Sequence, residues 1–297
     1  MKPMNLIIGD LGRTRKDKGL ITIAVVCFAG ALLMVMVNLG TFLFLINTPE
    51  EELRKMLESS MSMIGAVTDD MIDTIIASIR ENPDSFKADL GFAALISVIN
   101  SGLFVLIAAI GLAIFNGGDF TFNTIRNKVI AGNSRIKIYL SQCAVNLIIF
   151  FTLFLVTLAF TLSLCAIFLR LENFGHILLQ LLLSLPLYIS MVAIFTCISM
   201  ATRSRLLGIL ISLALVIFLP VPLQIVQGAG LFNIPPNETA VMILESNPFS
   251  MLDTKILADF DAATAPSTIL KAMLVALAYG VLATTAGLFV FNKADLK

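Results

Sequence analysis

Six long apolar stretches constrain the fold of this chain more than any other feature of its sequence. A helix needs about 20 apolar residues in a row to cross the hydrocarbon core of a bilayer. All six stretches reach that length, and Lys271, near one end, is the only charged residue inside them. A transmembrane barrel would show alternating segments of about ten residues instead. The pattern therefore predicts an all-α integral membrane protein with six spans, at 20–46, 90–115, 140–169, 177–201, 206–227 and 269–291.

The composition excludes several other classes of protein. Only 13% of the residues are charged, against about 25% in soluble domains. The net charge of zero gives no field that would attract nucleic acid. The single histidine, His176, excludes a multi-histidine metal site. All four cysteines fall inside predicted spans, where we expect them to pack as small apolar side chains.

The charges between the spans predict the orientation. Segments 1–19, 116–139, 202–205 and 292–297 hold 13 Lys and Arg against 4 Asp and Glu. The segments on the other side hold 7 Lys and Arg against 16 Asp and Glu. Because short cytoplasmic loops carry the excess of Lys and Arg, both termini are predicted to be cytoplasmic, in the cell membrane of a bacterium. The first apolar run is too long for a cleaved signal peptide, so we expect it to remain as an anchor.

Three segments outside the spans have a pattern of their own. Residues 1–19 form a basic segment with an apolar side, which predicts an interfacial helix. In 47–89, apolar residues recur every three or four positions from Glu50 to Arg80, which predicts one amphipathic helix of about 30 residues with an acidic opposite face. This extracellular helix could pack on its own bundle, extend from the membrane as a hairpin, or serve as a lid or docking surface. Prolines and glycines in 228–268 predict short or re-entrant helices.

The inner loop 116–139 has the most distinctive sequence of the chain. We expect Gly117 and Gly118 to break the second span. A new short helix then carries Phe122, Ile125 and Val129 on one face, with Ile130 as a further candidate for that face, and Arg126 and Lys128 at its sides. Gly132 can end this helix in a left-handed conformation, and Ser134 can cap the next one. The loop is predicted to present apolar and basic groups to the cytoplasm.

This loop resembles that of the ABC type-2 exporter permeases. The matching residues are Asp119, Asn123-Thr124-Ile125-Arg126, Gly132-Asn133-Ser134-Arg135 and Tyr139-Leu140, with Asn123 where glycine is common. The basic N-terminus, the six spans, the Asn-Pro-Phe before the last span and the ending Phe291 to Leu296 are similar too. The resemblance implies a coupling helix that docks on a separate ATP-binding subunit, and a second permease, identical or paralogous. It assigns this coupling role to Asp119, Phe122, Thr124, Ile125, Arg126, Lys128, Val129, Gly132, Ser134 and Arg135.

The chain lacks the motif that binds ATP phosphates. A P-loop requires a Gly-Lys pair, and the sequence contains none. We therefore expect that this chain is not an enzyme and holds no cofactor, and that ATP and Mg²⁺ bind to the partner ATPase. The predicted function is the permease of an exporter for a hydrophobic or amphipathic cargo, such as an antimicrobial or other peptide, a lipid or a drug. A peptide-sensing or immunity subunit remains an alternative. A secondary transporter is disfavoured, because the spans contain no acidic residue.

Neutral polar side chains within the spans are the candidates for a translocation path. Such residues prefer to face other helices, so helix–helix contact is the competing interpretation. The candidate residues for contact with cargo are Asn38, Asn100, Asn146 and Gln180.

Overall fold

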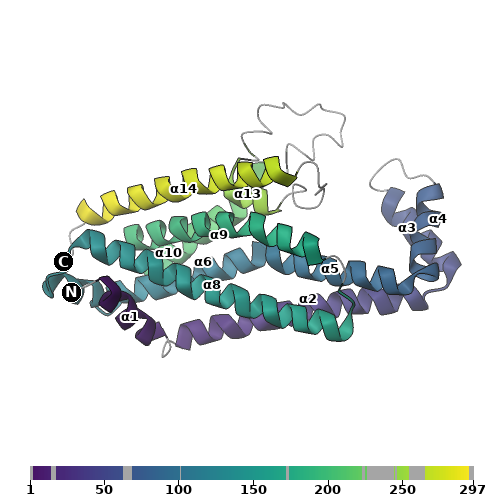
Figure 1. The fold of residues 1–297 in the computed structure, drawn as a ribbon, viewed down its shortest axis with the longest axis horizontal. Helices are drawn as coiled ribbons and strands as arrows, with labels where there is room; N and C mark the ends of the chain where they lie inside the picture. Colours follow the sequence, from purple (N-terminus) through teal and green to yellow (C-terminus); the bar gives the residue numbers. More distant parts are fainter. Residues whose placement is uncertain are drawn as a thin grey trace. The chain divides into compact units, whose positions relative to one another are not determined.

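The computed structural model describes residues 3–14, 18–62, 69–100, 102–171, 174–222, 225, 244, 246–253 and 265–293. All regular secondary structure in this part of the chain is helical (Figure 1). In chain order the helices are α1 (Pro3–Thr14), α2 (Lys18–Asn47), α3 (Glu50–Ser62), α4 (Asp69–Glu81), α5 (Pro83–Asn100), α6 (Gly102–Thr121), α7 (Thr124–Ile130), α8 (Arg135–Phe168), α9 (Phe174–Thr202), α10 (Arg205–Phe218), α13 (Pro248–Asp253) and α14 (Ala265–Lys293).

Four of these helices are long and apolar enough to cross a membrane. They cover Lys18–Asn47, Arg135–Phe168, Ile177–Thr202 and Ser267–Lys293. The all-helical class is therefore confirmed, whereas the count of six spans is not. Within the described part of the predicted span 206–227 lies α10, whose 14 residues cover about 21 Å of a hydrocarbon core about 30 Å thick. The predicted span 90–115 falls on two helices, α5 and α6.

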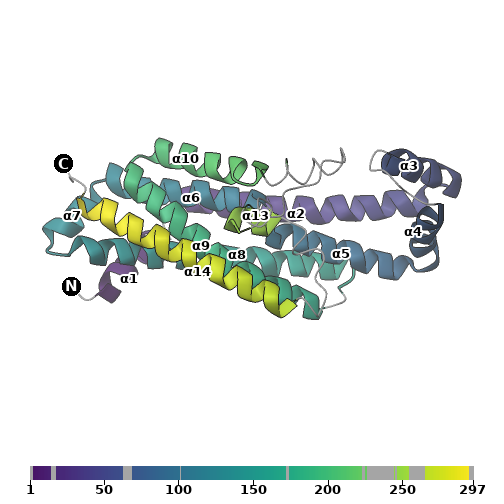
Figure 2. The ribbon, with the colours of Figure 1, turned by 90° about the horizontal axis from the view of Figure 1, so that it is seen from above.

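The chain divides into two compact units, and α2, α8 and α9 run through both. Unit 1 contains Met1–Cys27, Ile99–Leu155 and Leu179–Lys297. Within it, α10 packs along α6 (Figure 2). The prediction that Gly117 and Gly118 break a helix is wrong, because α6 continues to Thr121. These glycines serve close packing instead: a Cβ on Gly117 would lie 2.7 Å from Cγ of Arg205, the first residue of α10.

Three helix ends of unit 1 meet at the end of the bundle that carries α7. The start of α8 is bound to the end of α14, since Arg135 Nη1 donates to the carbonyl oxygen of Asn292 over 2.8 Å. The rings of Tyr139 and Phe291 lie 6.1 Å apart. Tyr139 also fills the space where Gly287 of α14 would carry a side chain. The end of α9 contributes Met200 to the same cluster. These contacts hold together the ends of α8, α9 and α14, against which α7 packs.

Unit 2 contains Phe28–Val98 and Val156–Leu178. Its α3 and α4 pack against each other around Leu53, Ile72, Ile76 and Ile79. An ion pair joins Arg54 of α3 to Asp73 of α4. The prediction of one 30-residue helix is therefore wrong, and the hairpin is the form that the structure takes. In α4, Ile72 and Ile76 are buried, whereas the neighbouring apolar residue Met71 is 55% exposed.

Little of the predicted segment 228–268 lies within the described residues. The part that does contains α13, which packs against α14 and α6. Asn247 Oδ1 accepts a hydrogen bond from the backbone N–H of Phe249 over 3.0 Å, so the Asn-Pro-Phe sequence caps this short helix. The ring of Phe249 packs edge-on against Phe195 of α9.

Candidate functional site

The short helix α7 is bounded by two residues in the left-handed region of the backbone. Asn123 precedes it with a φ of 56°, and Gly132 follows it with a φ of 82°. Glycine and asparagine are the residues that adopt this conformation most readily, so both residues suit their positions. Ser134 Oγ accepts from the backbone N–H of Lys137 over 3.5 Å, at the start of α8. The predicted stop at Gly132 and the cap at Ser134 are thus confirmed.

One face of α7 is buried in the chain's own bundle. Ile125 is 1% exposed and packs in a cluster with Ile138 and Tyr139 of α8, Met200 of α9 and Phe291 of α14. Val129, one helical turn later, packs against the same cluster. The sequence pattern predicted that Phe122, Ile125 and Val129 share one face that is presented to the cytoplasm. This prediction is wrong, because Ile125 and Val129 pack against the chain's own helices. Two of the three hold α7 to the membrane-spanning helices.

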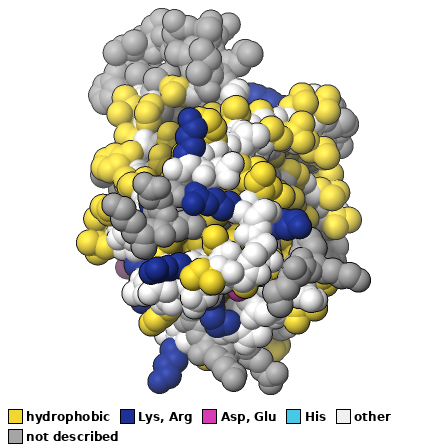
Figure 3. Space-filling model, turned by 90° about the vertical axis from the view of Figure 1, so that its left-hand side faces the viewer, with side chains coloured by type: hydrophobic (Ala, Val, Ile, Leu, Met, Phe, Trp, Pro, Cys, Tyr) yellow, Lys and Arg dark blue, Asp and Glu magenta, His cyan; other side chains and the backbone are white. Residues whose placement is uncertain are grey.

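The exposed side chains of this segment are Phe122, in the turn before α7, and Arg126 and Ile130 on the helix, and we call these three residues the outer face. Phe122 is 72% exposed and Ile130 is 73% exposed. The guanidinium carbon of Arg205 lies 5.1 Å from the centre of the Phe122 ring, a cation–π contact that supports the ring from α10. Figure 3 looks onto this end of the molecule and shows, among the side chains that are coloured, Lys and Arg next to hydrophobic ones and hardly any Asp or Glu. The surface combines apolar and basic groups.

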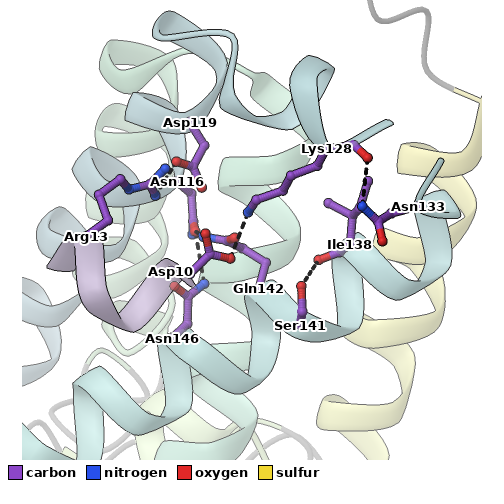
Figure 4. Close-up of polar contacts among 10 residues, drawn as sticks. All are labelled: Asp10, Arg13, Asn116, Asp119, Lys128, Asn133, Ile138, Ser141, Gln142 and Asn146. Carbon is purple, nitrogen blue, oxygen red and sulfur yellow. Dashed lines mark hydrogen bonds and ion pairs between the residues drawn. The ribbon is translucent and has the colours of Figure 1, made fainter. Parts of the chain in front are cut away.

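Two ion pairs connect α7 and the end of α6 to the N-terminal helix α1 (Figure 4). Lys128 Nζ lies 2.7 Å from Asp10 Oδ2, and both side chains are about nine-tenths buried. Arg13 is paired with Asp119. The resemblance assigns Lys128 a coupling role toward a partner, but in the structure Lys128 forms its ion pair with Asp10 of the same chain. Since an unpaired buried charge is costly, each pair holds α1 in place.

Asp119 has an unusual environment for a carboxylate. Its side chain is 1% exposed, and this burial raises its pKa from 3.8 to about 6, although the neighbouring charges of Arg13 and Lys128 act in the opposite direction. The guanidinium of Arg13 lies 5.0 Å above the ring of Phe115 and closes this site from outside. The two charges that lower this pKa come from other helices, Arg13 from α1 and Lys128 from α7.

Behind α7, a buried network of neutral side chains joins α6, α8 and α9. Asn116 Nδ2 donates to Ser199 Oγ over 2.7 Å. Its Oδ1 accepts from Gln142 Nε2 over 2.8 Å and from Asn146 Nδ2 over 3.1 Å. Asn146 Nδ2 also lies 2.9 Å from Thr196 Oγ1. In this structure Asn146, a candidate for cargo contact, forms interhelical hydrogen bonds, and Figure 4 shows it beneath Asn116.

Two other path candidates whose side chains are described, Asn38 and Gln180, are not members of this network. Asn38 Nδ2 donates to the carbonyl oxygen of Met34 in its own helix over 2.9 Å. Gln180 is buried on α9, but its position 16 residues before Thr196 corresponds to about 24 Å along the helix. Asn100 ends α5, and its side chain lies outside the described residues. Of the remaining coupling candidates, Thr124 begins α7 and Arg135 binds Asn292.

Sequence reasoning missed Asp10, Arg13 and Asn116 as members of the site. A signal for Asp10 exists, because it follows the buried Leu6 by four residues and so lies on the same face of α1. A carboxylate on a buried stripe requires a cationic partner. Asn116 carries no comparable signal, since its role depends on three helices that only the fold brings together.

In comparisons with known proteins, the chain matches no family model and no curated protein. Within the described part of the chain, no group of three or more His, Cys, Asp or Glu side chains could hold a metal ion. What the site offers chemically is a basic and apolar surface on a firmly anchored short helix. Such a surface is suited to binding another protein.

Proposed function

We propose that this chain is the membrane subunit of an ABC type-2 exporter, and that the outer face of α7 docks on a separate ATPase subunit. The observation that carries the proposal is the division of α7 into two faces. Ile125 fixes the helix to the spanning helices, while Phe122, Arg126 and Ile130 remain available to a partner. A helix built in this way can receive a push on one side and transmit it to the bundle on the other.

The contacts of α7 support this transmission role. Seven residues are too few to form a stable helix in isolation, so α7 keeps its shape through Ile125 and through the Lys128–Asp10 pair. Any displacement of α7 acts directly on the ends of α8, α9 and α14, which supply the cluster around Ile125. The partner would bind ATP and Mg²⁺, and closure of two ATPase subunits would reorient two permeases. The cargo is a hydrophobic or amphipathic molecule.

Purification from the native host tests this proposal. A tagged full-length chain is isolated in mild detergent, and the associated proteins are identified by mass spectrometry. We expect a stoichiometric polypeptide with the motif Gly-x4-Gly-Lys-Ser/Thr. Arg126→Glu should remove it, because the exposed Arg126 is the charged group of the outer face.

A matched charge reversal provides the control. Lys55 is also an exposed cation on a helix, but it belongs to α3 in unit 2. Lys55→Glu should leave the ATPase bound. Recovery of the wild-type chain without any P-loop protein, under several mild conditions, would contradict the proposed function and favour a secondary transporter or a sensor. Equal loss in both variants would contradict the role of the outer face.

A further inference from the structure

The α3–α4 hairpin connects the end of α2 to the start of α5. The chain leaves α2 at Asn47, passes through the hairpin and enters α5 at Pro83. Figure 1 shows α3 and α4 beside these ends of α2 and α5, and all residues concerned belong to unit 2. A connection of this length does not by itself keep its two ends together, because closing it costs chain entropy. The contacts at the base of the hairpin therefore determine how firmly the end of α2 is held to the start of α5.

Arg80, in the last turn of α4, closes the base of the hairpin. Its Nη1 donates to the carbonyl oxygen of Ile46 over 2.6 Å, and its Nη2 donates to the carbonyl oxygen of Thr48. The last four carbonyl groups of a helix have no partner within the helix, and a cation close to them interacts favourably with the helix dipole. One side chain thus binds the end of α2 to a residue that is only three positions before the start of α5.

Arg80 differs in its acceptors from two other arginines of unit 2. Arg54 is paired with Asp73, and Arg170 Nη1 lies 2.9 Å from Asp84 Oδ2. Both ion pairs are exposed, and such pairs contribute little to stability. The planar fork of Arg80 instead holds two backbone groups in a fixed geometry. Arg80 therefore ties the hairpin to α2, a helix that is long and apolar enough to span a membrane.

Apolar contacts place the hairpin between the two helix ends. Leu45 of α2 and Phe86 of α5 both pack against the hairpin core around Leu53, Ile72, Ile76 and Ile79. The two helices also contact each other, since the rings of Phe42 and Phe86 lie 6.4 Å apart. Lys87 Nζ lies 5.6 Å from the centre of the Phe42 ring, a cation–π contact. The hairpin thus contacts α2 and α5 at once, beside the point where they meet.

We propose that the α3–α4 hairpin is a strap that holds the ends of α2 and α5 together, and that these ends separate when Arg80 releases the carbonyl oxygens of Ile46 and Thr48. The apolar contacts position the strap. Because Arg80 is exposed, water can replace the carbonyl groups as its partners. The orientation predicted from the loop charges makes this the extracellular end, so the strap closes the side on which an exporter releases cargo. Only this link to cargo rests on the proposed function.

The distance between the two helix ends measures the strap directly. Spin labels are attached through noncanonical amino acids at Asn47 and Ser85, two exposed positions beside the base of the hairpin, in the full-length chain in lipid nanodiscs. Electron–electron resonance should give one narrow distance distribution in the otherwise wild-type chain. Arg80→Ala should add a longer distance and raise the population of separated ends about tenfold, the change that a loss of roughly 1.4 kcal/mol produces.

Two further variants keep the test specific. Arg80→Lys retains the charge but lacks the planar fork that serves two carbonyl groups, so it should give a smaller population of separated ends than Arg80→Ala. This milder variant carries the test if Arg80→Ala does not fold. Arg54→Ala is the matched control, because it removes a hairpin arginine whose ion pair lies between α3 and α4, and it should leave the distance unchanged.

Three outcomes would overturn the proposal. The first is a broad distance distribution in the wild-type chain, and the second is an unchanged distribution in both Arg80 variants. The third is faster exchange of the Thr48 amide, which bonds to the carbonyl oxygen of Phe44 over 3.0 Å, without any change in distance. That result would mean that Arg80 only caps α2. ATPase binding should be the same in the Arg80 variants as in the wild type, since α7 belongs to unit 1, so the strap and the proposed function fail separately.

Discussion

Truncating two isoleucines of the α7 segment should have different effects, and the difference tests how the helix is anchored. One change should destabilise α7, and the other should weaken its binding to a partner. Ile125 is 1% exposed, and Ile130, five residues later, is 73% exposed. Ile125→Ala and Ile130→Ala remove the same three carbon atoms. The first change removes the anchor of α7 within the bundle, whereas the second removes part of the surface that we assign to the partner.

The magnitude for Ile125 follows from its burial. Removing three buried carbon groups costs about 2.4 kcal/mol at about 0.8 kcal/mol each, and the remaining cavity raises the cost to about 3 kcal/mol. Because α7 cannot persist without its anchor, this cost should appear as local opening, which speeds amide exchange on the order of a hundredfold. At the exposed Ile130 the change should be within about 0.5 kcal/mol, or roughly twofold.

Hydrogen–deuterium exchange of the chain in lipid nanodiscs measures this difference. The informative amides lie in the segment from Asn127 to Ala131, whose N–H groups bond within α7. Ile125→Ala should accelerate them and leave the spanning helices protected, while Ile130→Ala should leave them unchanged and weaken ATPase binding. Equal exchange in the two variants would show that Ile125 does not anchor α7.

Two further predictions concern the contacts of α1. A double-mutant cycle of Lys128→Ala and Asp10→Ala, followed by thermal unfolding in detergent, should give a coupling of about 1–3 kcal/mol, because both partners are buried; a coupling near zero would mean that the pair does not hold α1. For Asp119, burial raises the pKa from 3.8 to about 6, so the folded state binds this proton more tightly than the unfolded state and loses stability as the pH rises from about 4 to 6. Relative to Asp119→Asn, the wild type should lose at most about 3 kcal/mol between pH 4 and pH 7; a pH-independent difference in their unfolding free energies would refute this assignment.

The sequence predicts the local boundaries of α7 well because these depend on neighbouring residues. Gly132 and Ser134 end one helix and cap the next, as expected from their conformational preferences. The sequence cannot tell which side of a short helix faces the bundle. The outer face consists of Phe122 in the turn before α7 and of Arg126 and Ile130 on the helix, while Ile125 and Val129 form the inner face. An apolar side chain can lie either against the bundle or at the exposed surface. Only the packing of the folded chain therefore determines which side of α7 is buried.

Two other differences between the sequence predictions and the structure also arise from tertiary contacts. Gly117 was expected to break a helix because of its low helical propensity, but the close approach of Arg205 requires the absence of a side chain there. The apolar period from Glu50 to Arg80 fits one long helix as well as two shorter ones. The ion pair between Arg54 and Asp73, 19 residues apart, is possible only in the hairpin. Local periodicity carries no information on where the chain reverses.

The most direct test of the coupling role is a photocrosslink from α7 in the native host. A photoreactive amino acid in place of the exposed Phe122 should form an adduct with a P-loop ATPase, identified by mass spectrometry. The same group in place of the buried Ile125 should react only within the chain. An adduct from position 122 alone would establish that the outer face of α7 contacts the motor subunit. The absence of any ATPase adduct from position 122, in cells that retain a functional full-length chain, would contradict the account.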